Sequence, residues 1–243
     1  MTARIDRLWP RPDENLTDDE LVSDLGPGVR VNFVSSIDGA VTHDGVSGGL
    51  SGAADKRHFE LLRRVCDVVV VGAGTVRDEG YGPMRVSPAS ARWRLERGMP
   101  EHPVFAIVSG SLELDENSRI FTGAPVRPIV VTTSRASGAD RFAHVADVVA
   151  EGTDHVDLPA ALEQLRARGL SSVLCEGGPS LFGALLAADA VDELCLTLAP
   201  TLEAGDSGRI AHGEIAEARG MELVHVLRSG DELLLRYRRG RNR

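Results

Sequence analysis

The sequence is short of several features, and each shortage narrows what the protein can be. Its only cysteines are Cys66, Cys175 and Cys195, an odd number without the paired spacing of a zinc site. We therefore expect free thiols in a reducing cytoplasm and no metal site. There is no apolar run of transmembrane length and no amino-terminal apolar segment of a signal peptide. We therefore expect no association with membranes.

Positive charge is in the minority, with 27 Lys and Arg against 36 Asp and Glu, for a formal net charge of −9. This balance argues against a nucleic-acid-binding surface, although it allows a local basic pocket for a phosphate. The chain also lacks the G-x-S-x-G turn of serine hydrolases and the H-E-x-x-H spacing of zinc proteases. A small-molecule substrate handled without a nucleophile or a metal is the remaining expectation.

The most informative segment surrounds Glu176. An apolar run, 172–175, is followed by Glu176, the pair Gly177-Gly178, and a helix that begins near Pro179. Proline fits the first helical position because that position needs no hydrogen-bond donor. The free N–H groups at such a helix start bind anions, and glycines let a ligand approach the backbone closely. The segment therefore predicts a phosphate-binding turn with a carboxylate beside it.

The order of elements predicts the fold class. Continuous apolar runs indicate strands that are covered on both faces, as in a parallel sheet. We expect such strands over 29–35, 67–71, 104–108, 128–132 and 172–175, and helices over 53–65, 92–97, 157–168 and 180–188. After the last of these helices the alternation of strands and helices ends. We expect a strand over 192–199 and a hairpin formed by 221–227 and 232–237.

These elements predict a mixed α/β fold with a mostly parallel sheet, helices on both faces and a carboxyl-terminal antiparallel hairpin. Residues 1–28, rich in Pro and Asp, are expected to form a surface arm, and residues 29–243 a single domain.

Three further positions have both a structural and a functional interpretation. The strand that precedes Gly72-Ala-Gly-Thr75 suggests a dinucleotide-binding turn, but Arg77 stands where the third glycine belongs. Its backbone and the Thr75 hydroxyl remain available to a nucleotide. Asp38 lies in an Asp-Gly pair that is typical of turns. Asp55 lies in the first turn of a helix, where acidic residues are common because of the helix dipole.

Four segments occur in an order that resembles the RibD C-terminal family, the reductase domain of riboflavin biosynthesis. They are Ser35-Ser-Ile-Asp-Gly39, Leu62-Arg63 with 67–76, Glu176 to Leu181, and Val191-Asp-Glu-Leu194 continuing to Ala199-Pro200. The resemblance covers about residues 29–238. It implies a dihydrofolate-reductase-like fold, NADPH as cofactor, and hydride transfer to the ribosyl C1′ of a ribosylamino-pyrimidine 5′-phosphate. It also implies a homodimer, for which the strand 195–198 and the final hairpin are the candidate surface.

The resemblance assigns roles residue by residue. Glu176 is implied as a catalytic group near the reacting carbon, where it would stabilise a developing iminium charge. Substrate contacts are implied for Asn32, Asp38, Arg63 and Arg85. Cofactor contacts are implied for Val34, Leu50, Gly72, Thr75, Glu79, Ser109, Thr132, Gly177, Gly178, Pro179, Ser180, Leu181, Phe182 and Gly183.

Two departures from the family pattern bear on the substrate. Asn32 stands where the family commonly has Lys, and the stretch from Glu79 to Arg85 is one residue shorter than usual. Asp55 lies where dihydrofolate reductases, which this fold resembles, place a catalytic-site carboxylate that binds the 2-amino edge of a pterin. A dihydrofolate or pterin reductase is therefore an alternative, and a non-catalytic NADPH-binding protein is a second alternative.

Overall fold

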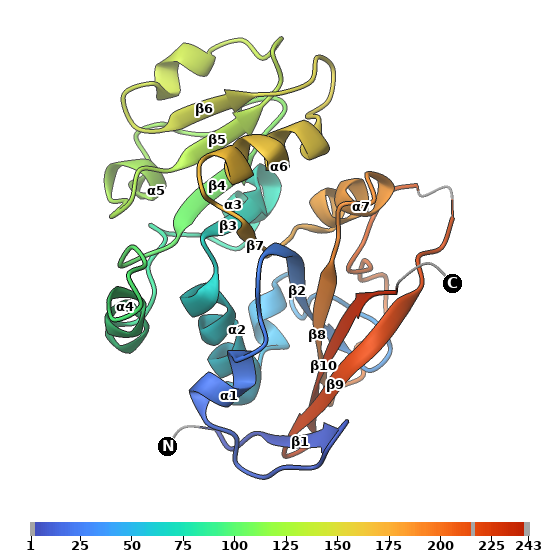
Figure 1. Ribbon diagram of the computed structural model, residues 1–243. Coiled ribbons are helices and arrows are strands. Elements are labelled where there is room, and N and C mark those ends of the chain that lie inside the picture. The colour runs from blue at the N-terminus through green and yellow to red at the C-terminus, as the bar shows by residue number, and fades with distance from the viewer. Residues whose placement is uncertain (1–2, 215–216, 241–243) are drawn as a thin grey trace.

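The computed structural model describes residues 3–214 and 217–240, so the outer ends of the predicted arm and domain, 1–2 and 241–243, lie outside the described residues. One sheet of ten strands runs through the protein in the order β1-β9-β10-β8-β2-β7-β3-β4-β5-β6 (Figure 1). Helices lie on both faces of its parallel part. The predicted fold class is confirmed.

The parallel part of the sheet carries the site. Its strands are β8 (Glu193–Ala199), β2 (Gly28–Ser36), β7 (Ser172–Cys175), β3 (Val68–Gly72), β4 (Val104–Val108), β5 (Ile129–Thr132) and β6 (Asp147–Ala150). Most of these strands are Val-rich and buried on both faces, which is why their sequences read as continuous apolar runs. β6 was not predicted, because it is short, begins at an acidic residue and is half exposed.

The antiparallel part is a hairpin plus an edge strand. β9 (Met221–Ser229) and β10 (Glu232–Arg239) meet at a turn where Gly230 has a positive φ of 58°, and β10 pairs with β8. β1 (Asp6–Trp9) adds to β9, with Asp6 opposite Arg228. The amino-terminal arm therefore does more than lie on the surface, since it extends the sheet and buries Ile5 and Leu16.

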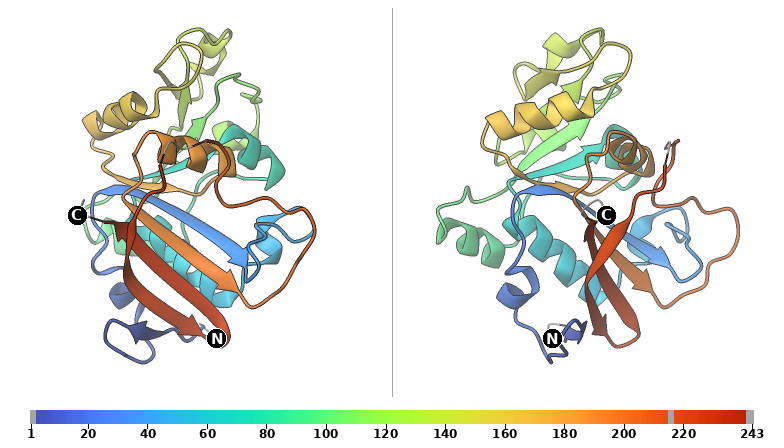
Figure 2. Two further views of the ribbon diagram at one scale, coloured as in Figure 1. Left: turned by 90° about the vertical axis from the view of Figure 1, so that its right-hand side faces the viewer. Right: turned by 45° about the vertical axis from the view of Figure 1, so that its right-hand side comes forward.

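Two helix layers cover the parallel strands. α6 (Leu158–Ala167) and α7 (Pro179–Ala187) pack on one face, and α2 (Ala53–Val65), α3 (Ala73–Asp78) and α5 (Arg119–Thr122) pack on the other. α1 (Asp18–Val22) and α4 (Pro88–Leu95) pack against α2, and single 3-10 turns lie at η1 (Ser47–Gly49) and η2 (Ala139–Phe142). Among the described elements, no helix covers the outer face of β8, β10 and β9 (Figure 2).

The layer between α2 and the sheet is polar as well as apolar. Arg30 donates to Glu193 at 2.6–2.8 Å, and Arg236 pairs with Asp24. His58 of α2 is buried beside them. Burial, with the neighbouring His225 as a further cause, lowers the pKa of His58 to about 3. Burial and then Arg236 lower the pKa of His225 to about 4, so both imidazoles are neutral in the folded protein at neutral pH.

These two histidines predict a pH-dependent stability. Their folded-state pKa values lie below the ordinary 6.5. Between these values and pH 6.5 the unfolded chain therefore binds protons that the folded chain does not bind. The free energy of unfolding should fall as the pH drops from about 6.5 towards about 4, by roughly 1.4 kcal/mol per pH unit for each histidine. Urea unfolding measured at several pH values across this range should show that the free energy of unfolding of His58→Gln falls less steeply with decreasing pH than that of the wild type. The exposed His155→Gln is the control, and an unchanged slope for His58→Gln would contradict the assignment.

Candidate functional site

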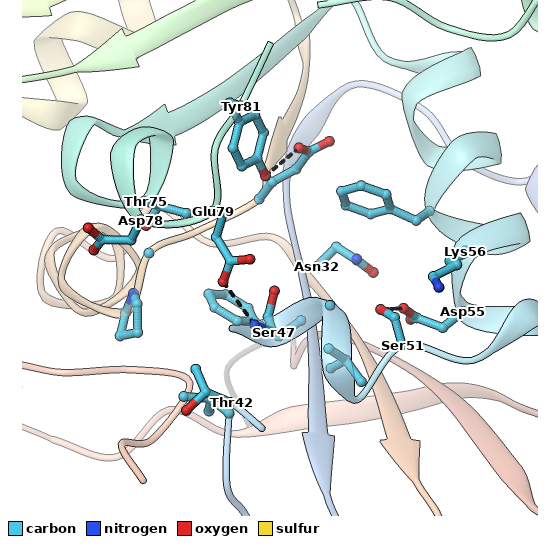
Figure 3. Close-up of a pocket in the computed structure, with 18 of the residues that line it drawn as sticks. Asn32, Thr42, Ser47, Ser51, Asp55, Lys56, Thr75, Asp78, Glu79 and Tyr81 are labelled. Atoms are coloured by element: carbon cyan, nitrogen blue, oxygen red, sulfur yellow. Dashed lines mark hydrogen bonds between the residues drawn. The ribbon is translucent and has the colours of Figure 1, made fainter. Parts of the chain in front are cut away.

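A cavity of about 520 Å³ opens at the carboxyl ends of β2, β3 and β7, with α2, α3 and the start of α7 around it (Figure 3). Parallel order puts these strand ends side by side, although their sequences are far apart. The volume of the cavity is typical of a small-molecule site. The predicted residues that line it are Asn32, Val34, Asp55, Arg63, Thr75, Glu79, Glu176, Gly178 and Pro179.

Glu176 is held from two sides. Arg63 of α2 donates through Nε and Nη2 to the two carboxylate oxygens, each at 2.6 Å. Tyr81 donates its hydroxyl to Oε2 at 3.0 Å, as the dashed line at Tyr81 marks (Figure 3). The Arg63 guanidinium also lies over the rings of Phe59 and Tyr81. A bidentate, buried pair of this kind is geometrically rigid, so the Glu176 carboxylate is fixed in place.

The ionisation of this group follows from its surroundings. Burial alone would lower the pKa of Arg63, but the charge of Glu176 and its hydrogen bonds, together with further nearby groups, raise it above the usual value. Burial and then Glu176 raise the pKa of Tyr81, so its phenol keeps the proton that it donates. Arg63 was predicted as a phosphate contact from the resemblance. In the structure two of its donor nitrogens are already used by Glu176.

A second acidic group lies at the amino-terminal end of α2. Asp55 is only 5% exposed, and its Oδ2 accepts a hydrogen bond from the Ser51 hydroxyl. Both side chains line the cavity, and Lys56 lies beside them (Figure 3). Asp55 therefore presents a fixed acceptor to a planar ligand that enters between α2 and β2.

The cavity wall is acidic. Four carboxylates line it, from Asp55, Asp78, Glu79 and Glu176, and the cations that line it are Lys56 and Arg63. Of the two cations, Arg63 is paired with Glu176, whereas the ion pairs among the described residues include none with Lys56. Lys56 is therefore the cation available to an anionic ligand.

The wall opposite Asp55 carries backbone N–H donors that suit a phosphate group. Gly178 precedes α7, and a Cβ added to it would lie 2.2 Å from Oγ1 of Thr75. This close approach brings the β3–α3 turn and the start of α7 together at the cavity. The first N–H groups of α7, at Ser180 and Leu181, have no partner within a helix, so they are donors of the type that hold phosphate. Glu79 closes the wall by accepting the N–H of Ser47 at 2.9 Å.

The other predicted cofactor residues lie behind or beyond this wall. Phe182 stacks on Phe33 in the core, and a Cβ on Gly183 would overlap the His212 carbonyl, so both positions serve packing. Leu50 packs with Val34. Gly72 joins the end of β3 to this wall, because its N–H donates to the Gly177 carbonyl at 2.9 Å. Ser109 and Thr132 are buried at the ends of β4 and β5 and do not line the cavity.

Two predicted substrate residues lie outside the cavity. Arg85 is exposed and donates to the Gly123 carbonyl at 3.1 Å. Asp38 accepts from Ser36 and from the N–H groups of Glu203 and Ala204, and these hydrogen bonds lower its pKa to about 2. Asp38 therefore organises the loop that follows β8. This structural role agrees with the Asp-Gly pair in the sequence, which is typical of turns.

Sequence reasoning missed Ser51, Lys56 and Tyr81. Lys56 could have been found from its position next to Asp55 in the first turn of α2. Tyr81 had no such signal, because only the folded loop after α3 brings its hydroxyl to Glu176.

Sequence comparison relates this chain to known proteins. The model of the RibD C-terminal domain matches residues 27–235. A 2,5-diamino-6-ribosylamino-4(3H)-pyrimidinone 5′-phosphate reductase of Methanothermobacter thermautotrophicus is 29% identical over 221 residues, which cover 88% of this chain and 98% of that one.

Solved structures share the fold. A pyrimidine reductase-like protein of Corynebacterium diphtheriae superposes with a TM-score of 0.80 and 27% identity, covering 93% of this chain and 99% of that one. A dihydrofolate reductase of Enterococcus faecalis, complexed with NADP(H), superposes with a TM-score of 0.50 at 12% identity, covering 88% and 97%. At that identity the second likeness concerns the fold alone.

Proposed function

The chain belongs to the RibD C-terminal domain family, and we propose that it is a cytoplasmic, NADPH-dependent reductase of riboflavin biosynthesis that acts on a ribosylamino-pyrimidine 5′-phosphate. The observation that carries the proposal is the cavity itself, in which Asp55 and Glu176 face the amino-terminal end of α7. The three cysteines are free and buried, which suits a reducing compartment. We assign the reductase to residues 29–243, with residues 1–28 as its arm.

Asp55 favours a substrate ring with a 2-amino group. A 2-amino-pyrimidinone presents two neighbouring N–H donors, which a carboxylate accepts as a pair. A uracil ring has a carbonyl oxygen at that edge and would meet the carboxylate with repulsion. Hydrogen bonds to a charged acceptor are worth about 1.5–3 kcal/mol each, so the preference should be strong. We therefore propose the 2,5-diamino compound, the substrate named for the Methanothermobacter relative, as the substrate.

The substrate phosphate needs a cation, and we assign it to Lys56. Lys56 is exposed at the mouth of the cavity, where a phosphate remains partly hydrated. Arg63 is committed to Glu176, and Arg85 lies outside the cavity. Asn32, 8% exposed on β2, then offers an amide to the ring or the ribose instead of a second cation.

The reaction adds a hydride to the ribosyl C1′, breaks the C1′–O4′ bond and adds a proton to O4′. NADPH supplies the hydride when it is bound. Positive charge develops at C1′ and the attached nitrogen as the ring opens, and a fixed carboxylate at this place stabilises it. We assign that task to Glu176. Because Arg63 and Tyr81 hold both of its oxygens, Glu176 acts through its charge and its position.

The first experiment follows NADPH oxidation with three acceptors in parallel. These are the 2,5-diamino-pyrimidinone phosphate, the 5-amino-uracil phosphate and dihydrofolate. We expect turnover of the diamino compound, at least about tenfold faster in kcat/KM than that of the uracil compound. Turnover of dihydrofolate alone would replace the proposal with a pterin reductase. NADPH binding without any turnover would leave a non-catalytic binding protein.

Glu176→Gln tests the charge at the reacting carbon. The amide keeps the size of the side chain but removes the negative charge, so kcat should fall by about a hundredfold or more while the Kd for NADPH changes little. Stopped-flow single turnover and fluorescence titration give the two quantities. Arg85→Ala, outside the cavity, is the control. A large change in the Kd with an unchanged kcat would instead make Glu176 a cofactor ligand.

We also propose a homodimer that uses the outer face of β8 and the final hairpin. On this face Leu194, Leu196, Leu198, Leu233 and Leu235 are only partly buried, and no described helix covers them. Exposed apolar sheet faces of this kind mark interfaces.

Sedimentation at micromolar concentration should give a dimer, and Leu196→Glu should shift it towards monomer, because each copy would bury an unpaired charge. Leu202→Glu, on an exposed loop, is the control. A wild-type protein that sediments only as a monomer would contradict the proposal.

A further inference from the structure

The carboxylate of Glu232 reaches the start of α2 from the far end of the chain. Glu232 is the first residue of β10, and its Oε1 accepts the N–H of Gly52 at 3.1 Å. The N–H of Ala54, in the same first turn, also faces this carboxylate. Gly52 is the N-cap of α2 and has no side chain to cap the helix. Glu232 therefore accepts the N-cap N–H from outside the helix, as the glutamate of a capping box does from within it.

The contact between the two segments is close. A Cβ added to Gly52 would lie 2.3 Å from Oε1 and 2.6 Å from Oε2 of Glu232, so only glycine admits the carboxylate here. Glu232 is 9% exposed and does not line the cavity, whereas Ser51 and Asp55, on either side of the capped backbone, do. Glu232 thus lies directly behind the residues that face the substrate.

Two carboxylates consequently share one helix end. The charged groups of α2 that face Glu232 are Asp55 and Lys56, together with the N–H groups of Gly52 and Ala54. Burial, and then the charge of Asp55, raise the pKa of Glu232. The backbone donors and Lys56 act in the opposite direction. The placement of Asp55 and the charge on Glu232 are therefore linked through the first turn of α2.

We propose that Glu232 is a positioning residue for substrate selection, which acts through the capped first turn of α2 to hold Asp55 against the 2-amino edge of the substrate ring. The inference rests on the proposed function. It assigns to the final hairpin a role in choosing the substrate, beyond its place in the sheet. Loss of Glu232 frees the first turn of α2, and Asp55 then loses the fixed direction that a paired hydrogen bond to the ring requires.

The readout is the ratio of kcat/KM for the 2,5-diamino-pyrimidinone phosphate to that for the 5-amino-uracil phosphate. Glu232→Ala removes both cap and charge, and the ratio should fall by about tenfold, mainly through KM for the diamino compound. Glu232→Gln keeps an oxygen for Gly52 and should lower the ratio less. The Kd for NADPH should not change. Glu222→Gln, exposed on the neighbouring strand β9, is the matched control.

The pH profile provides a readout that a merely structural role would not move. Burial and the neighbouring Asp55 raise the pKa of Glu232, and Glu232→Gln removes this titrating group from the first turn of α2. The midpoint of the acidic limb of kcat/KM should therefore move to lower pH. If the midpoint of the acidic limb is the same in Glu232→Gln as in the wild type, the charge of Glu232 does not act on substrate selection and the inference is overturned. Because Glu232→Gln retains the capping oxygen, this test survives if Glu232→Ala fails to fold.

A double-mutant cycle decides whether Glu232 acts through Asp55. In an Asp55→Asn background, a further Glu232→Gln change should leave the substrate ratio where Asp55→Asn alone has put it. Additive effects would overturn the inference. A wild-type ratio retained in every Glu232 variant would overturn the inference and leave the proposed function intact. A wild-type enzyme that turns over neither pyrimidine phosphate would refute the proposed function, and the inference with it.

Discussion

The ion pair between Arg63 and Glu176 is the interaction on which the rest of the site depends. It joins α2 on one face of the sheet to the connection between β7 and α7, and the Tyr81 hydroxyl ties in the loop after α3. An unpaired Glu176, whose side chain is 1% exposed, would be a costly buried charge. The pair therefore holds together the three segments that form the cavity, as well as orienting one carboxylate.

The charge distribution around that pair explains how an acidic cavity can serve a phosphorylated substrate. Carboxylates line the interior, and Lys56, which forms no ion pair with another described residue, lies exposed at the rim. Such an arrangement separates the two ends of the proposed substrate by charge. The phosphate remains near water and the ring enters the acidic interior, so the wall that would repel the phosphate also sets the direction in which the substrate lies.

Local sequence signals predicted the elements and the backbone features of the site, while long-range pairing remained hidden. α2 runs over its predicted range because its apolar face is a local sequence pattern, and Pro179 is a local signal for the start of α7. Arg63 was predicted as a substrate contact because no local pattern shows that Glu176 would occupy it. Glu232 lies 180 residues from Gly52, and only the finished sheet brings them together. The edge strand β1 was missed because its four residues have no apolar run.

That edge strand has a consequence for how the protein is made. β1 pairs with β9, and Arg57 of α2 bonds the Ala3 and Leu16 carbonyls of the same amino-terminal segment. β1 must therefore wait for residues 221–229 before it can enter the sheet, and contacts between such distant segments form slowly. During that interval Ile5 and Leu16 have only part of their burial site available. In nascent chains of this protein, the segment that contains Ile5 and Leu16 should accordingly stay without its full burial until β9 has been synthesised.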